Sequence, residues 1–73
     1  MKSKYIIIKK DGIEVPLVFS KTLTHEDLAT NDTVISAGFC ELDVTGKWIV
    51  GGRSFSLNMM PRPQDAEILN AHL

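Results

Sequence analysis

The stretch of residues 34–57 constrains the fold of this chain more than any other. Two runs rich in β-branched and aromatic residues, 33–42 and 47–57, flank the turn sequence Asp-Val-Thr-Gly. Two such runs on either side of a turn predict a β-hairpin. The same stretch holds the only Trp, the only Cys and four of the five Gly residues of the chain.

The remaining segments predict a second hairpin and two helices. Residues 5–9 and 13–19 read as strands joined by a turn with Asp-Gly, a pair favoured in tight hairpin loops. Pro16 has no amide hydrogen, which places the second strand at a sheet edge. A capping-box-like Thr-His-Glu-Asp sequence predicts a short helix at about 24–29. A proline at the first turn predicts a closing helix at about 63–71.

This order, ββαββα, predicts an α+β domain with an antiparallel sheet of about four strands, a short helix after the second strand and a C-terminal helix. We expect residues 1–73 to form a single domain, since a chain of this length supports only one small core. One cysteine excludes an internal disulfide, and Cys40, His25 and His72 are too few for a zinc site. Self-association is therefore the expected source of extra stability.

Composition narrows the location and the kinds of partner. The chain is 44% hydrophobic and 23% charged, which argues against disorder. Its net charge of −1 gives no general attraction to nucleic acid or membranes. No apolar run approaches the ~20 residues of a membrane span, and the apolar stretch 5–8 is too short for a signal peptide. The expectation is a cytoplasmic protein without a cofactor.

The fourth predicted strand carries apolar residues on both faces. Trp48 and Val50 point opposite to Ile49, Phe55 and Leu57 in the alternating pattern. The second face therefore needs a cover, either from helices of the same chain or from a partner. Tryptophan is common at interface hot spots. The first hypothesis is a small non-enzymatic binding or accessory protein, whose Trp48 and Val50 contact a protein partner or a second copy.

The alternative hypothesis is an anion or nucleic-acid site in the glycine-rich segment. Exposed amides, guanidinium groups and hydroxyls could bind an anion there. These groups belong to Gly51, Gly52, Arg53, Ser54, Ser56 and Arg62. The segment does not match a P-loop, because no Gly-Lys-Ser/Thr follows. The structural alternative is a bulged strand with Ser54 and Ser56 on its solvent side.

Evidence for catalysis in the sequence is weak. Cys40 and His25 could form a thiolate and its base. However, a lone Cys on a strand is usually a small buried residue, and His25 is expected to be an exposed first-turn residue. No sequence pattern brings a nucleophile, a base and a stabilising group together, so we expect a protein that is not an enzyme.

Three segments resemble a group of short uncharacterised bacterial and phage-associated proteins. They are S-A-G-F at 36–39, G-G-R-S-F-S-L at 51–57 and R-P-Q-D-A at 62–66. The resemblance covers roughly the C-terminal half and supplies no activity or site residue. Its phage association implies a small accessory or regulatory protein.

Overall fold

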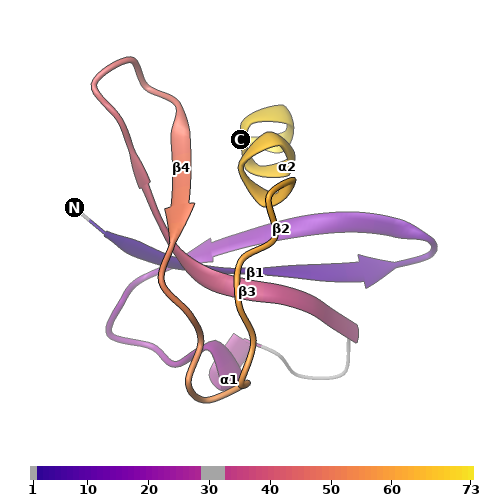
Figure 1. The fold of residues 1–73 in the computed structure, drawn as a ribbon. Helices are drawn as coiled ribbons and strands as arrows, with labels where there is room; N and C mark the ends of the chain where they lie inside the picture. Colours follow the sequence, from indigo (N-terminus) through magenta and orange to yellow (C-terminus); the bar gives the residue numbers. More distant parts are fainter. Residues whose placement is uncertain (1, 29–32) are drawn as a thin grey trace.

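The computed structural model describes residues 2–28 and 33–73 of the protein. Its elements follow in the order β1 (Ser3–Lys10), β2 (Ile13–Phe19), α1 (His25–Leu28), β3 (Thr33–Leu42), β4 (Trp48–Gly51) and α2 (Asp65–His72). The strands form one antiparallel sheet in the order β2-β1-β3-β4 (Figure 1). The expected α+β class and the antiparallel sheet are confirmed.

The first hairpin follows the sequence pattern closely. β1 and β2 pair in a register that sets Ile7 opposite Pro16. Asp11 and Gly12 both have positive φ, 53° and 78°, as a type I′ turn requires. Among the described strands β2 comes first in the order of the sheet, so it lies at an edge, as the proline predicts.

The expected fourth strand over residues 47–57 is wrong in its second half. β4 ends at Gly51, and the chain bends at Gly52, which has φ of +72°. A Cβ on Gly52 would lie 2.8 Å from the Phe39 ring, so glycine lets the backbone cross closely over that side chain. Beyond the bend the chain forms a separate turn, closed by a bridge between Ser54 and Met59.

The helices differ from expectation mainly at their ends. α1 lies within the predicted 24–29 segment, and Ala29 lies outside the described residues. α2 begins at Asp65, two residues later than expected. Pro63 and Gln64 form the turn before it, and Asp65, the first residue of the helix, is buried.

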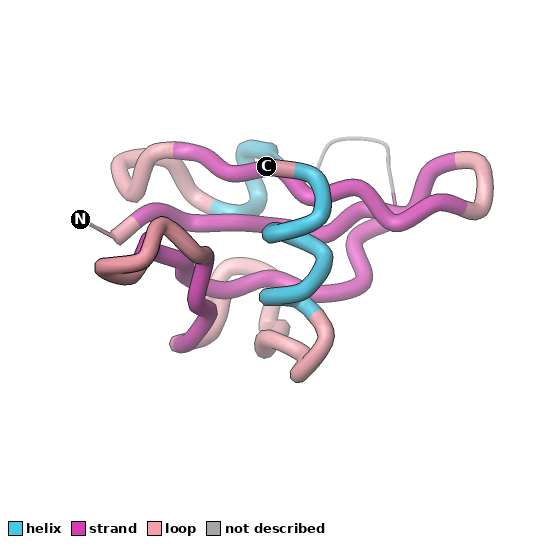
Figure 2. The backbone as a smooth tube through the Cα atoms, turned by 90° about the horizontal axis from the view of Figure 1, so that it is seen from above, coloured by secondary structure: helices cyan, strands magenta, loops and turns pink. Residues whose placement is uncertain are grey.

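The two helices cover opposite faces of the sheet (Figures 1 and 2). On the face we call the α2 face, Leu69 of α2 forms a buried cluster with Tyr5, Ile7 and Cys40. The opposite side, the α1 face, has a second buried cluster made by Ile6, Ile8 and Ala37. Leu28 of α1, Leu57 and Met59 pack against this second cluster. β1 is apolar at consecutive positions because it is central and covered on both sides.

After the 53–60 segment the chain passes close to β3 at Pro61. A Cβ on Gly38 would lie 2.6 Å from Cγ of Pro61 and 3.1 Å from the carbonyl oxygen of Gly51. Gly38 is buried in β3. The absence of a side chain there lets Pro61 lie directly on the sheet on the way to α2.

We expect Gly38→Ala to lower the free energy of unfolding by about 1–3 kcal/mol, because the added methyl must displace Pro61 in a packed site. Gly51→Ala is the matched control, since a Cβ there meets no atom within 4 Å. The control should change stability by less than about 0.5 kcal/mol. Urea denaturation measures both variants, and equal midpoints would contradict the close crossing at Gly38.

Candidate functional site

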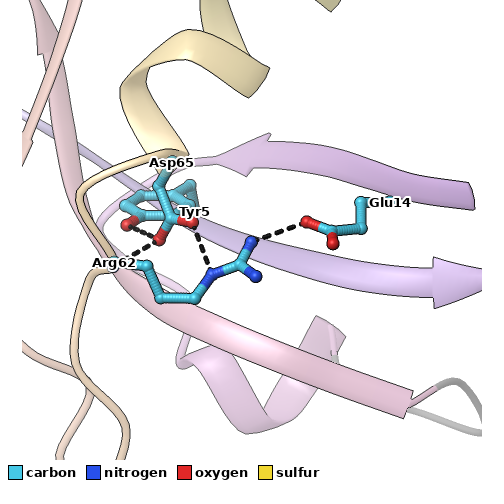
Figure 3. A network of polar contacts seen from close by, with 4 residues as sticks. All are labelled: Tyr5, Glu14, Arg62 and Asp65. Carbon is cyan, nitrogen blue, oxygen red and sulfur yellow. Dashed lines mark hydrogen bonds and ion pairs between the residues drawn. The ribbon is translucent and has the colours of Figure 1, made fainter.

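A buried polar network lies at the start of α2 (Figure 3). Asp65 is fully buried, and its carboxylate accepts three hydrogen bonds. The Tyr5 hydroxyl donates to Oδ2 at 2.6 Å, and the backbone N–H of Arg62 donates to the same oxygen at 2.9 Å. Arg62 Nε donates to Oδ1 at 2.9 Å. These donors compensate the loss of water around the carboxylate.

The network continues from α2 to the edge of the sheet. Arg62 Nη2 donates to Glu14 Oε1 on β2 at 2.7 Å. This hydrogen bond and the contacts with Asp65 raise the pKa of Arg62. Burial, and then the bond to Asp65, raises the pKa of Tyr5, so its hydroxyl stays a donor. Arg62, a predicted anion ligand, is therefore held by two carboxylates of its own chain.

A different group of residues lines a hollow of about 250 Å³ on the α1 face. We call it the cationic pocket, and its lining consists of Lys4, Thr24, His25, Phe39, Arg53, Phe55 and Ser56. Two of its cations lie over aromatic rings. Lys4 Nζ is 5.8 Å from the centre of the Phe39 ring, and Arg53 Cζ is 5.1 Å from the centre of the Phe55 ring.

The turn after β4 presents Phe55 to solvent. The Ser54 hydroxyl accepts the Leu57 N–H at 3.2 Å, and the Ser54–Met59 bridge closes the base of the turn. Arg53 is fixed beside it by a 2.7 Å hydrogen bond from Nη2 to Asn58 Oδ1. As a result, Phe55 is 82% exposed, and its ring lies next to a guanidinium group.

His25 is only 3% exposed, and the expectation of an exposed histidine is wrong. Its ring packs edge-on between Phe19 and Phe39, with centroid distances of 5.5 and 5.7 Å. Nε2 donates to the carbonyl oxygen of Gly38 at 2.7 Å. Burial and, more weakly, the nearby Lys4 lower the pKa of His25, although the hydrogen bond to Gly38 opposes them. The imidazole is therefore a neutral wall of the pocket.

The structure divides the residues of the predicted glycine-rich anion site. Arg53 and Ser56 line the cationic pocket, whereas Gly51 and Gly52 line a smaller hollow next to it. Ser54 is fully buried and binds within its own turn, so it does not lie on the solvent side. The bend at Gly52 separates these residues, because it takes the chain out of the strand in which they would have alternated.

Trp48 and Val50 lie on the α2 face and pack against its cluster. The Trp48 backbone N–H donates to Asn70 Oδ1 at 2.7 Å, and Asn70 Nδ2 donates to the Trp48 carbonyl oxygen at 3.1 Å. The Asn70 amide thus pairs with the backbone of β4 as a neighbouring strand would. The cover that these residues require comes from α2 of the same chain, and self-association through them stays a prediction.

Cys40 and His25 do not meet, because Cys40 lies in the α2-face cluster and His25 on the α1 face. Burial also raises the pKa of the Cys40 thiol to about 11, so the thiolate is scarce at neutral pH. Within residues 2–28 and 33–73, no three His, Cys, Asp or Glu side chains are grouped as metal ligands. Neither of the helices in these ranges has the length and hydrophobicity to cross a membrane.

Sequence reasoning missed Lys4 and Phe55 in the pocket and Tyr5, Glu14 and Asp65 in the network. The three-residue spacing of Arg62 and Asp65 at a helix start was the one local signal for an ion pair. The other partners are distant along the chain: Tyr5 and Asp65 are 60 residues apart, and Glu14 and Arg62 are 48 apart. Their pairing depends on the tertiary fold.

We expect Tyr5→Phe to lower the free energy of unfolding by about 1–3 kcal/mol, because Asp65 loses a donor that water cannot replace in a buried site. Glu14→Gln is the comparison, since its ion pair with Arg62 is partly exposed and should be worth about 1 kcal/mol or less. Chemical denaturation of both variants at pH 7 measures the two losses. Equal small losses would contradict the role of the Tyr5–Asp65 bond.

The lowered pKa of His25 makes stability depend on pH. The unfolded chain takes up a proton near pH 6.5, whereas folded His25 resists it until lower pH. The contribution of His25 to the free energy of unfolding should therefore be complete above pH 6.5. It should decrease as the pH drops from 6.5 toward the lowered pKa of the folded state. Denaturation from pH 7.5 to 5 measures this slope. His25→Gln should flatten it and His72→Gln should keep it; equal slopes in both variants would contradict the assignment.

Comparison of the chain with family models, with curated proteins and with solved structures finds no match.

Proposed function

We propose that the protein is a small, non-enzymatic, cytoplasmic accessory protein that binds an anionic ligand in the cationic pocket. The ligand carries a phosphate-like group beside a planar ring. One observation supports this most strongly: Lys4 and Arg53, each placed against an aromatic ring, line the same hollow.

Neither cation has a carboxylate as its hydrogen-bond partner, although Asp27 of α1 lies near enough to Lys4 to feel its charge. Lys4 Nζ donates to the carbonyl oxygen of Leu23 at 2.7 Å, and Arg53 donates to the neutral amide of Asn58. No carboxylate is among the described residues that line the pocket. Among the same residues, Arg53 Nε is buried without a hydrogen-bond acceptor. A local excess of positive charge in a concave site attracts anions even when the net charge of the chain is −1.

The aromatic rings supply the second half of the recognition. The exposed Phe55 ring has a free face on which a planar ligand can stack, and stacking beside a guanidinium adds a cation–π contribution. Ser56 and Thr24 add hydroxyl groups that can donate to or accept from the ligand. His25 is held by Gly38 and two aromatic rings, so the pocket uses it as a wall.

A titration with adenosine monophosphate tests this proposal. We expect binding at millimolar AMP or below in low salt, weaker binding of adenosine, and weakening with added salt. Arg53→Ala should reduce affinity about ten-fold or more, as expected for the loss of a hydrogen bond to a charged group. Isothermal titration calorimetry measures the affinities.

Lys10→Ala is the control, because Lys10 is an exposed cation at the end of β1 next to the first turn and does not line the pocket. This variant has the same net charge as Arg53→Ala. Equal weakening by both variants would show that only overall charge matters. That result, or no binding of AMP or any oligonucleotide, would overturn the proposal.

A further inference from the structure

We propose that the ligand is a single-stranded nucleic acid that continues beyond the cationic pocket, past Phe39, to Lys2. This inference depends on the proposed function and extends it. It starts from a second hollow of about 100 Å³, lined in part by Lys2, Glu41, Gly51 and Gly52. Phe39 lines both hollows, so the two are adjacent on the α1 face.

Cations recur along this path at the spacing of a strand. Lys2 directly precedes β1 and is two residues from Lys4, a separation of about 7 Å in extended chain. Both side chains line hollows that share Phe39, so they lie on the same face. Arg53 provides a third positive charge. It follows the bend at Gly52, where the backbone crosses the Phe39 ring, and lines the same hollow as Lys4. A row of cations with aromatic rings between them matches a polymer with repeating phosphates and bases.

The floor of the second hollow is open to a close approach. A Cβ on Gly51 would meet no atom within 4 Å, so this part of β4 is bare backbone with space above it. Glycines in strands often mark places where a ligand or another chain approaches the backbone. The edge of β4 at Trp48 is occupied by Asn70, so the accessible backbone lies at the Gly51 end.

A single strand fits this surface better than a duplex. Bases of a single strand have free faces that can stack on Phe55, whereas those of a duplex are stacked on each other. The path is short and hollowed, and its ring-bearing turn projects from it. A duplex would meet the lysines with its phosphates alone and leave Phe55 without a partner.

Glu41 makes the proposal testable by position. It contributes a carboxylate to the second hollow only, so it repels a phosphate that reaches this hollow and has little effect on a ligand confined to the first. Glu41→Gln should strengthen binding of a long strand about three-fold, the size of one charge–charge repulsion at ~6 Å in water. Lys2→Ala should weaken binding of the same strand and reduce its salt dependence.

The experiment is fluorescence anisotropy with labelled oligothymidylates, from the dinucleotide to the decanucleotide, at low salt. We expect Phe55→Ala to lose about five-fold or more at every length. Glu41→Gln and Lys2→Ala should change affinity only for strands long enough to reach the second hollow. Lys10→Ala gives the effect of net charge alone, and circular dichroism confirms that each variant is folded.

The contrary outcomes separate this inference from the proposed function. In one outcome AMP binds and Arg53→Ala weakens it, while Lys2→Ala and Glu41→Gln leave the affinity for strands of every length unchanged. In that case the ligand is a single nucleotide, so this inference is wrong and the proposed function stands. Equal binding of duplex DNA or of oligoglutamate, with Phe55→Ala silent, would also overturn the inference. If no nucleotide or oligonucleotide binds, both fail.

Discussion

The buried carboxylate of Asp65 is the constraint on which the rest of the structure depends. A helix of eight residues does not hold itself together in water, so α2 must be fixed by tertiary contacts. Tyr5 and Arg62 provide them at the first turn, and Leu69 and Asn70 continue the contact along the helix. Because Tyr5 lies on the central strand, this one carboxylate aligns the end of the chain with its beginning, and the buried cluster of the α2 face forms beneath it.

This anchoring divides the molecule into two faces with different properties. The α2 face is closed by a helix whose asparagine also pairs with the edge of β4, which blunts that edge against pairing with other chains. The α1 face is covered by a single helical turn and by the segment after β4, and between them these leave the cationic pocket. The polar network at Asp65 and the cationic pocket thus lie on opposite sides of one sheet.

The parts of the fold that could be predicted are those set by local pattern. The bounds of β2 and β3, the Asp-Gly turn and the edge position of Pro16 follow from alternation and backbone chemistry over a few residues. The pocket could not be predicted, because Lys4 and Phe55 come together only through the bend at Gly52. The apolar pattern predicts a strand that continues past this bend, whereas β4 ends at Gly51. Arg62 was assigned to an anion site because its partner Glu14 lies on β2, far away in the sequence. No local sequence pattern predicts their ion pair.

We propose that the α1 face binds the ligand, whereas the α2 face stabilises the fold. The most direct test is the ¹H–¹⁵N spectrum of the labelled protein during addition of a short single-stranded oligonucleotide. We expect the amide signals that move to belong to Lys2, Lys4, Arg53, Phe55 and their neighbours, while those of α2 stay in place. If the shifting signals were instead those of Trp48 and α2, the ligand would bind the α2 face, and the assignment of binding to the α1 face would be wrong.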